Sequence, residues 1–89
     1  MIAKSFIIAN KIGLHARPAA VLVQTANRFK SDIIIEKDGR RASAKNALDL
    51  LTLAVERGAV VTVEIQGRDE NEAMKAFEEL VNNRFGEQE

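Results

Sequence analysis

The chain of 89 residues is long enough for one small domain with a single hydrophobic core, and we expect residues 1–89 to form one domain. A hydrophobic content of 46% argues against wholesale disorder. Thirteen basic and thirteen acidic side chains cancel, which argues against non-specific binding to nucleic acid. The absence of cysteine excludes disulfides, thiolate metal sites and thiol catalysis, and a single histidine argues against a zinc site.

The distribution of apolar and charged residues predicts a cytoplasmic protein without membrane insertion. No apolar run approaches the roughly 18 residues that a membrane span requires, and Met1–Phe6 lacks the basic-then-apolar order of a signal peptide. Residues 1–63 contain ten basic and five acidic side chains, whereas residues 64–89 contain three basic and eight acidic ones. This asymmetry indicates either a solvated acidic last helix or a mildly positive face suited to acidic partners.

Hydrophobic periodicity predicts seven elements in the order βαββαβα. They are strand 2–8, helix 16–29, strands 33–37 and 40–43, helix 46–56, strand 59–66 and a last helix from about 69 to 81. Asp38–Gly39 is typical of a tight hairpin turn between the two adjacent strands. Strands with one polar face and helices with one apolar stripe predict an α+β fold with an open antiparallel sheet covered by helices on one side. Residues 86–89 are expected to fray.

Local signals place the ends of the helices. Pro18 fits only a first helical turn, so the first helix must begin beside His15. Asn46 is a favourable N-cap for the second helix, and Gly58 is its expected C-terminal stop. Residues 69–72 resemble a capping box at the start of the last helix.

The position of His15 at a helix N-terminus makes it the candidate nucleophile. An anion beside its ring would meet the backbone N–H groups of Ala16 and Arg17 together with the Arg17 guanidinium. No Asp or Glu lies within ten residues of His15, so no local carboxylate orients the ring, although a distant one could reach it by folding. The simplest chemistry for this arrangement is a phosphoryl group carried covalently on the imidazole.

Other catalytic patterns are absent from the sequence. The serines and threonines lack the glycine context of a nucleophile elbow, and neither phosphate-loop glycine motif occurs. One histidine without an acid, metal or cofactor motif does not support most enzymatic reactions. We therefore expect a carrier that is not itself an enzyme and that needs no cofactor and no metal.

The run Gly-Leu-His-Ala-Arg-Pro-Ala-Ala at residues 13–20 resembles the active-site signature of the HPr family, the histidine-containing phosphocarriers of the bacterial sugar phosphotransferase system. The resemblance extends over essentially the whole chain, including the hairpin at 38–39 and Ala-Lys-Asn at 44–46. It implies an open-faced β-sandwich, in which a four-stranded antiparallel sheet carries three helices on one face. It also implies that Enzyme I, phosphorylated by phosphoenolpyruvate, donates to Nδ1 of His15 beside Arg17, and that IIA proteins or domains accept the group.

The second helix has more apolar surface than one buried face requires. Between residues 47 and 55 only Asp49 and Thr52 are polar. We expect Leu50, Leu53 and Ala54 to face the sheet and Ala47, Leu48 and Leu51 to face solvent. Either a small core wraps this helix, or the outward side chains form a docking patch for another protein.

The resemblance favours the docking patch, because HPr proteins bind Enzyme I and IIA partners through this segment and the first helix. Ala20, Gln24 and Asn27 would belong to the same surface. Many relatives carry lysine at the positions of Gln24, Asn27 or Asp49, so electrostatic steering towards acidic partners should be weaker here. We expect the protein to act as a monomer that binds no nucleic acid.

Asn46 occupies the position at which many Gram-positive members of the family carry a regulatory serine. Asparagine caps a helix about as well as serine, but its amide offers no hydroxyl for a kinase to phosphorylate. The chain is therefore expected to lack this seryl regulation.

Two alternative functions remain open at the level of sequence. The order of elements also suits RNA-binding or small-ligand-binding α/β sandwiches, but the chain has no Tyr or Trp, and Phe29 and Phe77 lie on helical core stripes. A regulatory carrier of the nitrogen-related phosphotransferase branch would use the same chemistry at His15 and would differ only in its partners.

Overall fold

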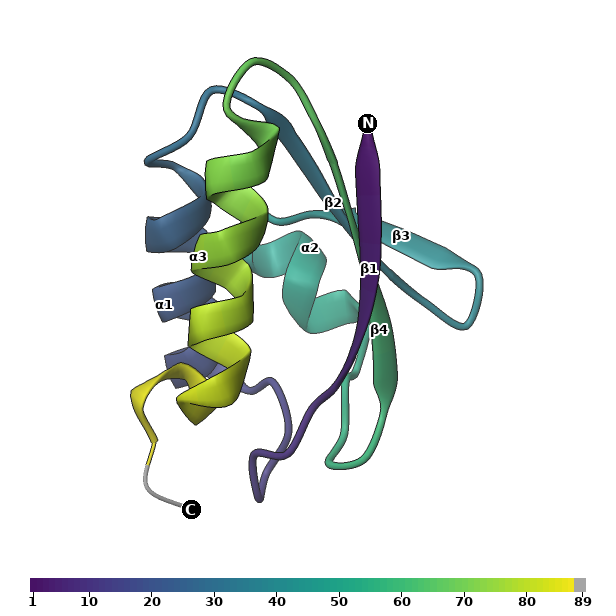
Figure 1. Cartoon of the computed structure of the whole chain (residues 1–89). Coiled ribbons are helices and arrows are strands. Elements are labelled where there is room, and N and C mark those ends of the chain that lie inside the picture. Colours follow the sequence, from purple (N-terminus) through teal and green to yellow (C-terminus); the bar gives the residue numbers. More distant parts are fainter. Residues whose placement is uncertain (88–89) are drawn as a thin grey trace.

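A four-stranded sheet with helices on one of its faces forms the body of the protein (Figure 1). The computed structural model describes residues 1–87. The elements are β1 Ile2–Ile7, α1 Ala16–Ala26, β2 Asp32–Lys37, β3 Arg40–Ser43, α2 Ala47–Thr52, β4 Val60–Gln66, α3 Glu70–Asn82 and the 3₁₀ turn η1 Arg84–Gly86. The predicted order βαββαβα is therefore confirmed. Within residues 1–87, no helix is long and apolar enough to cross a membrane.

The strands follow the order β1-β4-β2-β3, and all neighbours are antiparallel. β4 lies between β1 and β2, so the first strand pairs with the last one. The helices α1, α2 and α3 lie on the same side of the sheet (Figure 1). The predicted α+β fold, an open-faced β-sandwich with three helices on one face of an antiparallel sheet, is confirmed.

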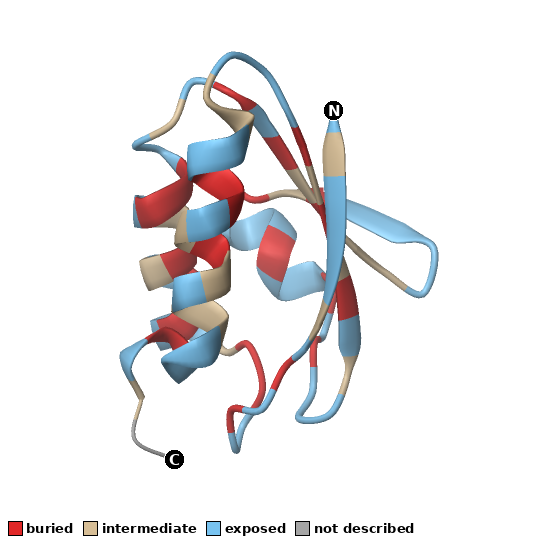
Figure 2. Cartoon of the chain, viewed as in Figure 1, coloured by how far each residue is buried: buried red, intermediate tan, exposed pale blue. Residues whose placement is uncertain are grey.

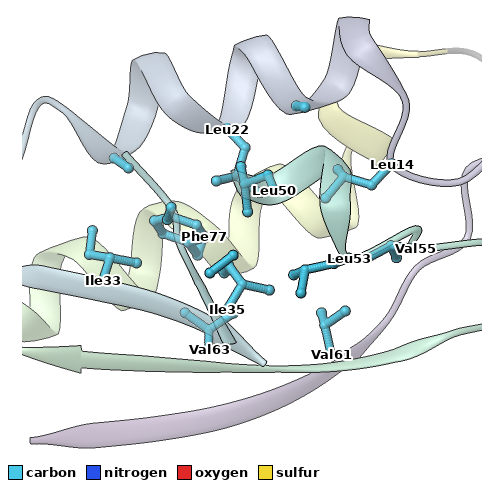
Figure 3. Close-up of a cluster of buried hydrophobic side chains, with 14 of the residues drawn as sticks. Leu14, Leu22, Ile33, Ile35, Leu50, Leu53, Val55, Val61, Val63 and Phe77 are labelled. Atoms are coloured by element: carbon cyan, nitrogen blue, oxygen red, sulfur yellow. The ribbon is translucent and has the colours of Figure 1, made fainter. Parts of the chain in front are cut away.

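The core lies between the sheet and the helices, where buried segments of both layers face each other (Figure 2). Strand alternation directs Val61, Val63 and Ile65 inward, and each is at most 4% exposed. Phe77 of α3 and Leu50 of α2 lie within the same cluster (Figure 3). Burial of each large aliphatic side chain contributes about 1.5–3 kcal/mol, so this cluster is the main source of stability that positions the helices.

The hairpin between β2 and β3 has the predicted tight turn. Asp38 and Gly39 both have positive φ, at 53° and 82°. Two consecutive residues of this kind form the turn whose twist matches that of antiparallel strands, and Asp-Gly is a favoured pair for it.

The predicted end of the second helix is wrong. α2 ends at Thr52, with Leu53 as the C-cap, and Ala54 adopts a left-handed φ of 50°. The Lys37 ammonium donates to the carbonyls of Leu53 and Ala54 at 3.2 and 3.0 Å, which stabilises this early end. Ala54 is consequently exposed and does not face the sheet, and Gly58 lies in the turn before β4.

The predicted capping box of the last helix does not form. The carboxylate of Asp69, the N-cap of α3, accepts no hydrogen bond from that helix. It accepts instead from the Ser31 hydroxyl and from the backbone N–H groups of Lys30 and Ser31. These bonds, that of the Ser31 hydroxyl foremost, lower the pKa of Asp69 to about 2. A tertiary contact between the α1–β2 loop and α3 therefore replaces the local cap.

Candidate active site

His15 is the N-cap residue of α1, as the sequence predicts. Its backbone is extended, with φ −84° and ψ −168°, and its carbonyl accepts the first helical hydrogen bond from Ala19 at 3.0 Å. The imidazole makes no capping bond to the helix, and the side chain is 34% exposed. The ring is therefore held at the helix N-terminus while remaining accessible from solvent.

The groups predicted to hold an anion lie in the helical turn that directly follows His15. Ala16 and Arg17 are exposed residues of the first turn, so their N–H groups have no intrahelical acceptors. The first turn contains no acidic residue, and Pro18 is buried behind it. The positive end of the α1 dipole and the Arg17 guanidinium thus favour a negative group beside His15.

Gly13 fixes the path of the chain into His15. Its φ is +73°, and a Cβ built at this position would overlap the backbone of Val55 and Glu56. The N–H of the next residue, Leu14, donates to the Val55 carbonyl at 2.9 Å, and Leu14 is 5% exposed. The close approach of the two backbones explains why this position is glycine.

A distant carboxylate reaches His15 from the C-terminal segment. Oε2 of Glu87 lies 2.9 Å from Nε2 of His15, although 72 residues separate them. Oε1 of Glu87 accepts a hydrogen bond of 2.6 Å from the Asn10 amide, which also donates to the Arg84 carbonyl at 2.8 Å. The expectation that residues 86–89 fray is wrong for Glu87, while Gln88 and Glu89 lie outside the described residues.

The C-terminal segment is held by burial as well as by hydrogen bonds. Phe85 is 3% exposed, and Asn10 is 1% exposed. Residues 84–86 all have positive φ, which turns the chain back towards α1 after α3 ends. An aromatic residue followed by glycine after the last helix was the available signal for this turn, but spacing alone does not reveal its contact with residue 10.

The Glu87 contact distinguishes the two ring nitrogens. The Asn10 amide, and after it His15 and Arg17, lower the pKa of Glu87, although partial burial opposes this shift. An ionised carboxylate can only accept hydrogen bonds, so Nε2 of His15 must carry the proton that it donates. In the neutral ring, the lone pair then lies on Nδ1.

The side chains predicted to form the docking patch are individually exposed on α1 and α2. Leu48 and Leu51 are 76% and 39% exposed, and Ala47 is also exposed. On α1, Ala20, Gln24 and Asn27 are exposed as well. The predicted solvent exposure is thus confirmed, whereas docking itself stays a prediction.

Asn46 begins α2 in the predicted way. It is the N-cap residue, and its side-chain oxygen accepts a hydrogen bond of 3.1 Å from the Asp49 N–H. The structural role expected of a capping residue is therefore fulfilled by an amide side chain.

The family model and similar curated proteins assign the chain to the same family. Residues 2–83 match the family described as the PTS HPr component phosphorylation site. The chain is 44% identical to the phosphocarrier protein HPr of Xylella fastidiosa over 98% of both chains. It is 43% identical to that of Neisseria meningitidis over the full length of both, and 48% identical to the HPr-like protein Crh of Bacillus subtilis over 84% of this chain and 88% of that protein.

Solved structures agree with this assignment. An HPr of Thermoanaerobacter tengcongensis has a TM-score of 0.96 and 45% identity, with complete coverage of both chains. An HPr of Bacillus anthracis has a TM-score of 0.85 and 42% identity, covering 90% of this chain and 95% of that one. Sequence, fold and the histidine at the start of α1 lead to one conclusion: the chain belongs to the HPr family of phosphocarrier proteins of the phosphotransferase system.

Proposed function

We propose that His15 accepts a phosphoryl group on Nδ1 from phosphorylated Enzyme I and transfers it to IIA proteins or domains for sugar uptake. The observation that supports this most directly is the Glu87 contact, because it occupies Nε2 and leaves the Nδ1 lone pair as the nucleophile. As the Nδ1–P bond forms, the bond between phosphorus and the donor breaks, and Nε2 keeps its proton facing Glu87.

The first turn of α1 supports the product of this step. The N–H groups of Ala16 and Arg17 and the Arg17 guanidinium offer donors to the phosphoryl oxygens. The protein acts as a relay that needs no cofactor or metal, since the group arrives and leaves as a covalent adduct. The full-length relatives named phosphocarrier protein HPr favour the sugar branch over the nitrogen-related one.

The test is phosphorylation with purified Enzyme I and phosphoenolpyruvate, followed by intact mass and ³¹P NMR. We expect the mass of one phosphoryl group, labile in acid and stable in base, with the resonance of an Nδ1 adduct. Phosphate on Nε2 would contradict the proposed role of Glu87, and no adduct at all would contradict the function.

Arg17→Ala should slow phosphoryl transfer by about tenfold or more, since it removes a charge-assisted contact to the phosphoryl oxygens. The free energy of unfolding should change by less than about 0.5 kcal/mol, because Arg17 is exposed. Rapid-quench assays of phosphoryl transfer from Enzyme I measure the rate. The matched control is Arg68→Ala, which removes an exposed cation before α3. Equal rates in the two variants would exclude a phosphate contact.

Leu48→Glu should weaken binding to Enzyme I and IIA proteins by roughly tenfold or more, because a charge would replace the most exposed leucine of the proposed docking patch. The side chain is 76% exposed, so the melting temperature should barely move. Titration calorimetry measures the affinity. Val60→Glu, at a position 55% exposed on β4, is the control; unfolding of the Leu48 variant would show that the leucine belongs to the core.

Glu87→Gln should remove the preference for a proton on Nε2, because an amide can donate to this nitrogen as well as accept from it. In the parent protein, Glu87 is ionised near neutral pH because its pKa lies below the usual carboxyl range, so it can only accept from Nε2. Ring ¹⁵N shifts of His15 near pH 8 report the tautomer, and Glu72→Gln, on the exposed side of α3, is the control. Unchanged ring shifts would show that Glu87 does not set the tautomer.

A further inference from the structure

A second candidate site lies where β1 leaves the sheet. Residues 7–9 and Gly58 wall a pocket of about 460 Å³, and Lys11, Arg57 and Arg84 complete its lining. The volume is within the range of small-molecule sites, roughly 300–1,000 Å³. None of these lining residues belongs to the anion-binding groups around His15.

The three cations reach this pocket from separate parts of the chain. Lys11 follows β1, Arg57 precedes β4 and Arg84 follows α3. Among residues 1–87, no carboxylate lies within 4.0 Å of any of the three. Lys4 and Arg41, by contrast, each form an ion pair with a glutamate. Three cations that line one pocket without an ion-pair partner among residues 1–87 repel one another, and a bound anion would relieve this repulsion.

The wall of the pocket supplies an apolar surface beside this charge. Ile7 is 65% exposed, which is unusual for a large aliphatic side chain, whereas its neighbour Ile8 is buried. Such a surface suits a short carbon skeleton, and guanidinium groups match phosphate oxygens in a planar, bidentate geometry.

We propose that this pocket binds a small phosphorylated metabolite, with its phosphate between Lys11, Arg57 and Arg84 and its carbon skeleton against Ile7. The combination of apolar wall and cations distinguishes this ligand from free phosphate, which would use only the cations. The proposal concerns the unphosphorylated protein alone and does not require the transfer reaction.

The pocket lies next to the residues that hold Glu87 against His15. Asn10 lies between the lining residues Ala9 and Lys11, and its buried amide binds both the Arg84 carbonyl and Glu87. A ligand that contacts Lys11 and Arg84 therefore contacts the chain neighbour of Asn10 and the residue whose carbonyl the Asn10 amide binds. The consequence for His15, a change in how firmly Glu87 holds Nε2, rests on the proposed function.

The test is a titration of ¹⁵N-labelled protein with 3-phosphoglycerate, and separately with inorganic phosphate, at constant ionic strength. We expect saturable shifts at residues 7–11, 57, 58 and 84, with at least roughly threefold tighter binding of 3-phosphoglycerate, because its carboxylate adds an anion beside the cations and its carbon skeleton contacts Ile7. The Asn10 side-chain amide and the His15 ring should shift in the same titration. Equal affinities for the two probes would overturn the organic ligand in favour of free phosphate.

Charge-reversal variants distinguish binding in this pocket from non-specific electrostatic attraction of anions to the protein surface. Arg57→Glu should weaken binding of 3-phosphoglycerate by about tenfold or more, whereas Lys30→Glu, which changes the net charge equally at an exposed site, should not. No saturable shift up to about 10 mM, equal loss in both variants, or shifts confined to residues 15–17 would overturn the proposal. Phosphoryl transfer by Arg57→Glu without ligand should match that of the parent, so failure of the transfer assay and failure of binding are separate results.

Discussion

His15→Ala should abolish phosphorylation by phosphorylated Enzyme I, leaving no acid-labile phosphate on the protein. The chain has one histidine, so no second imidazole can take over. The remaining groups of the site, Ala16 and Arg17, can only donate hydrogen bonds to an anion and cannot form the covalent adduct. Loss of the nucleophile removes the reaction itself, and the expected effect is therefore larger than that of any change in the anion-binding groups.

The fold should survive this substitution. The His15 side chain is 34% exposed, and its hydrogen bond is to Glu87. We expect thermal unfolding to shift by only a few degrees, as is typical for the loss of one partly exposed hydrogen bond. Intact mass after incubation with Enzyme I and phosphoenolpyruvate gives the result, and phosphate persisting on the alanine variant would exclude His15 as the acceptor.

Gly13→Ala should destabilise the protein by about 3 kcal/mol or more, and should impair transfer as well. A left-handed φ costs an alanine roughly 1–2 kcal/mol, and the added Cβ would overlap backbone atoms of Val55 and Glu56, which cannot rotate away as a side chain could. The loop would have to move, breaking the hydrogen bond between Leu14 and Val55. The same movement would displace His15, which lies two residues after Gly13 in the chain.

Gly39→Ala is the matched control, because it has the same kind of backbone and open space around it. Its φ is +82°, and no atom lies within 4 Å of the position of an added Cβ. This variant should lose only the conformational cost, about 1–2 kcal/mol. Chemical denaturation of both variants measures the difference, and equal losses would show that the Gly13 loop relaxes without strain.

Local signals in the sequence were sufficient for the features that depend on neighbours in the chain. Pro18 located the start of α1 and hence the position of His15 at a helix N-terminus. Asp38–Gly39 located the hairpin, and alternation along β4 identified its buried face. Each of these depends on φ preferences or on periodicity, which a few consecutive residues determine.

Features that depend on contacts between residues far apart in the chain could not be predicted from local sequence signals. Lys37 stabilises the early end of α2 by binding the carbonyls of Leu53 and Ala54, and the Asp69 carboxylate binds Ser31 and not its own helix. Glu87 reaches His15 only because Asn10 and the buried Phe85 hold the C-terminal segment in place. Nothing in the spacing of these residues indicates which will meet, since their pairing follows from the assembled fold.

The order of strands also determines when the sheet can be completed during synthesis. β2 and β3 are joined by a two-residue turn and can pair as soon as both have left the ribosome. β1, the first strand made, has its partner in β4, where Ile2 lies opposite Ile65. More than sixty residues must therefore emerge before β1 is paired, and closure of this long loop is the slow step expected for such a topology. Until then the strand that leads into the His15 loop remains without its neighbour, and we expect the active site to be among the last parts of the molecule to form.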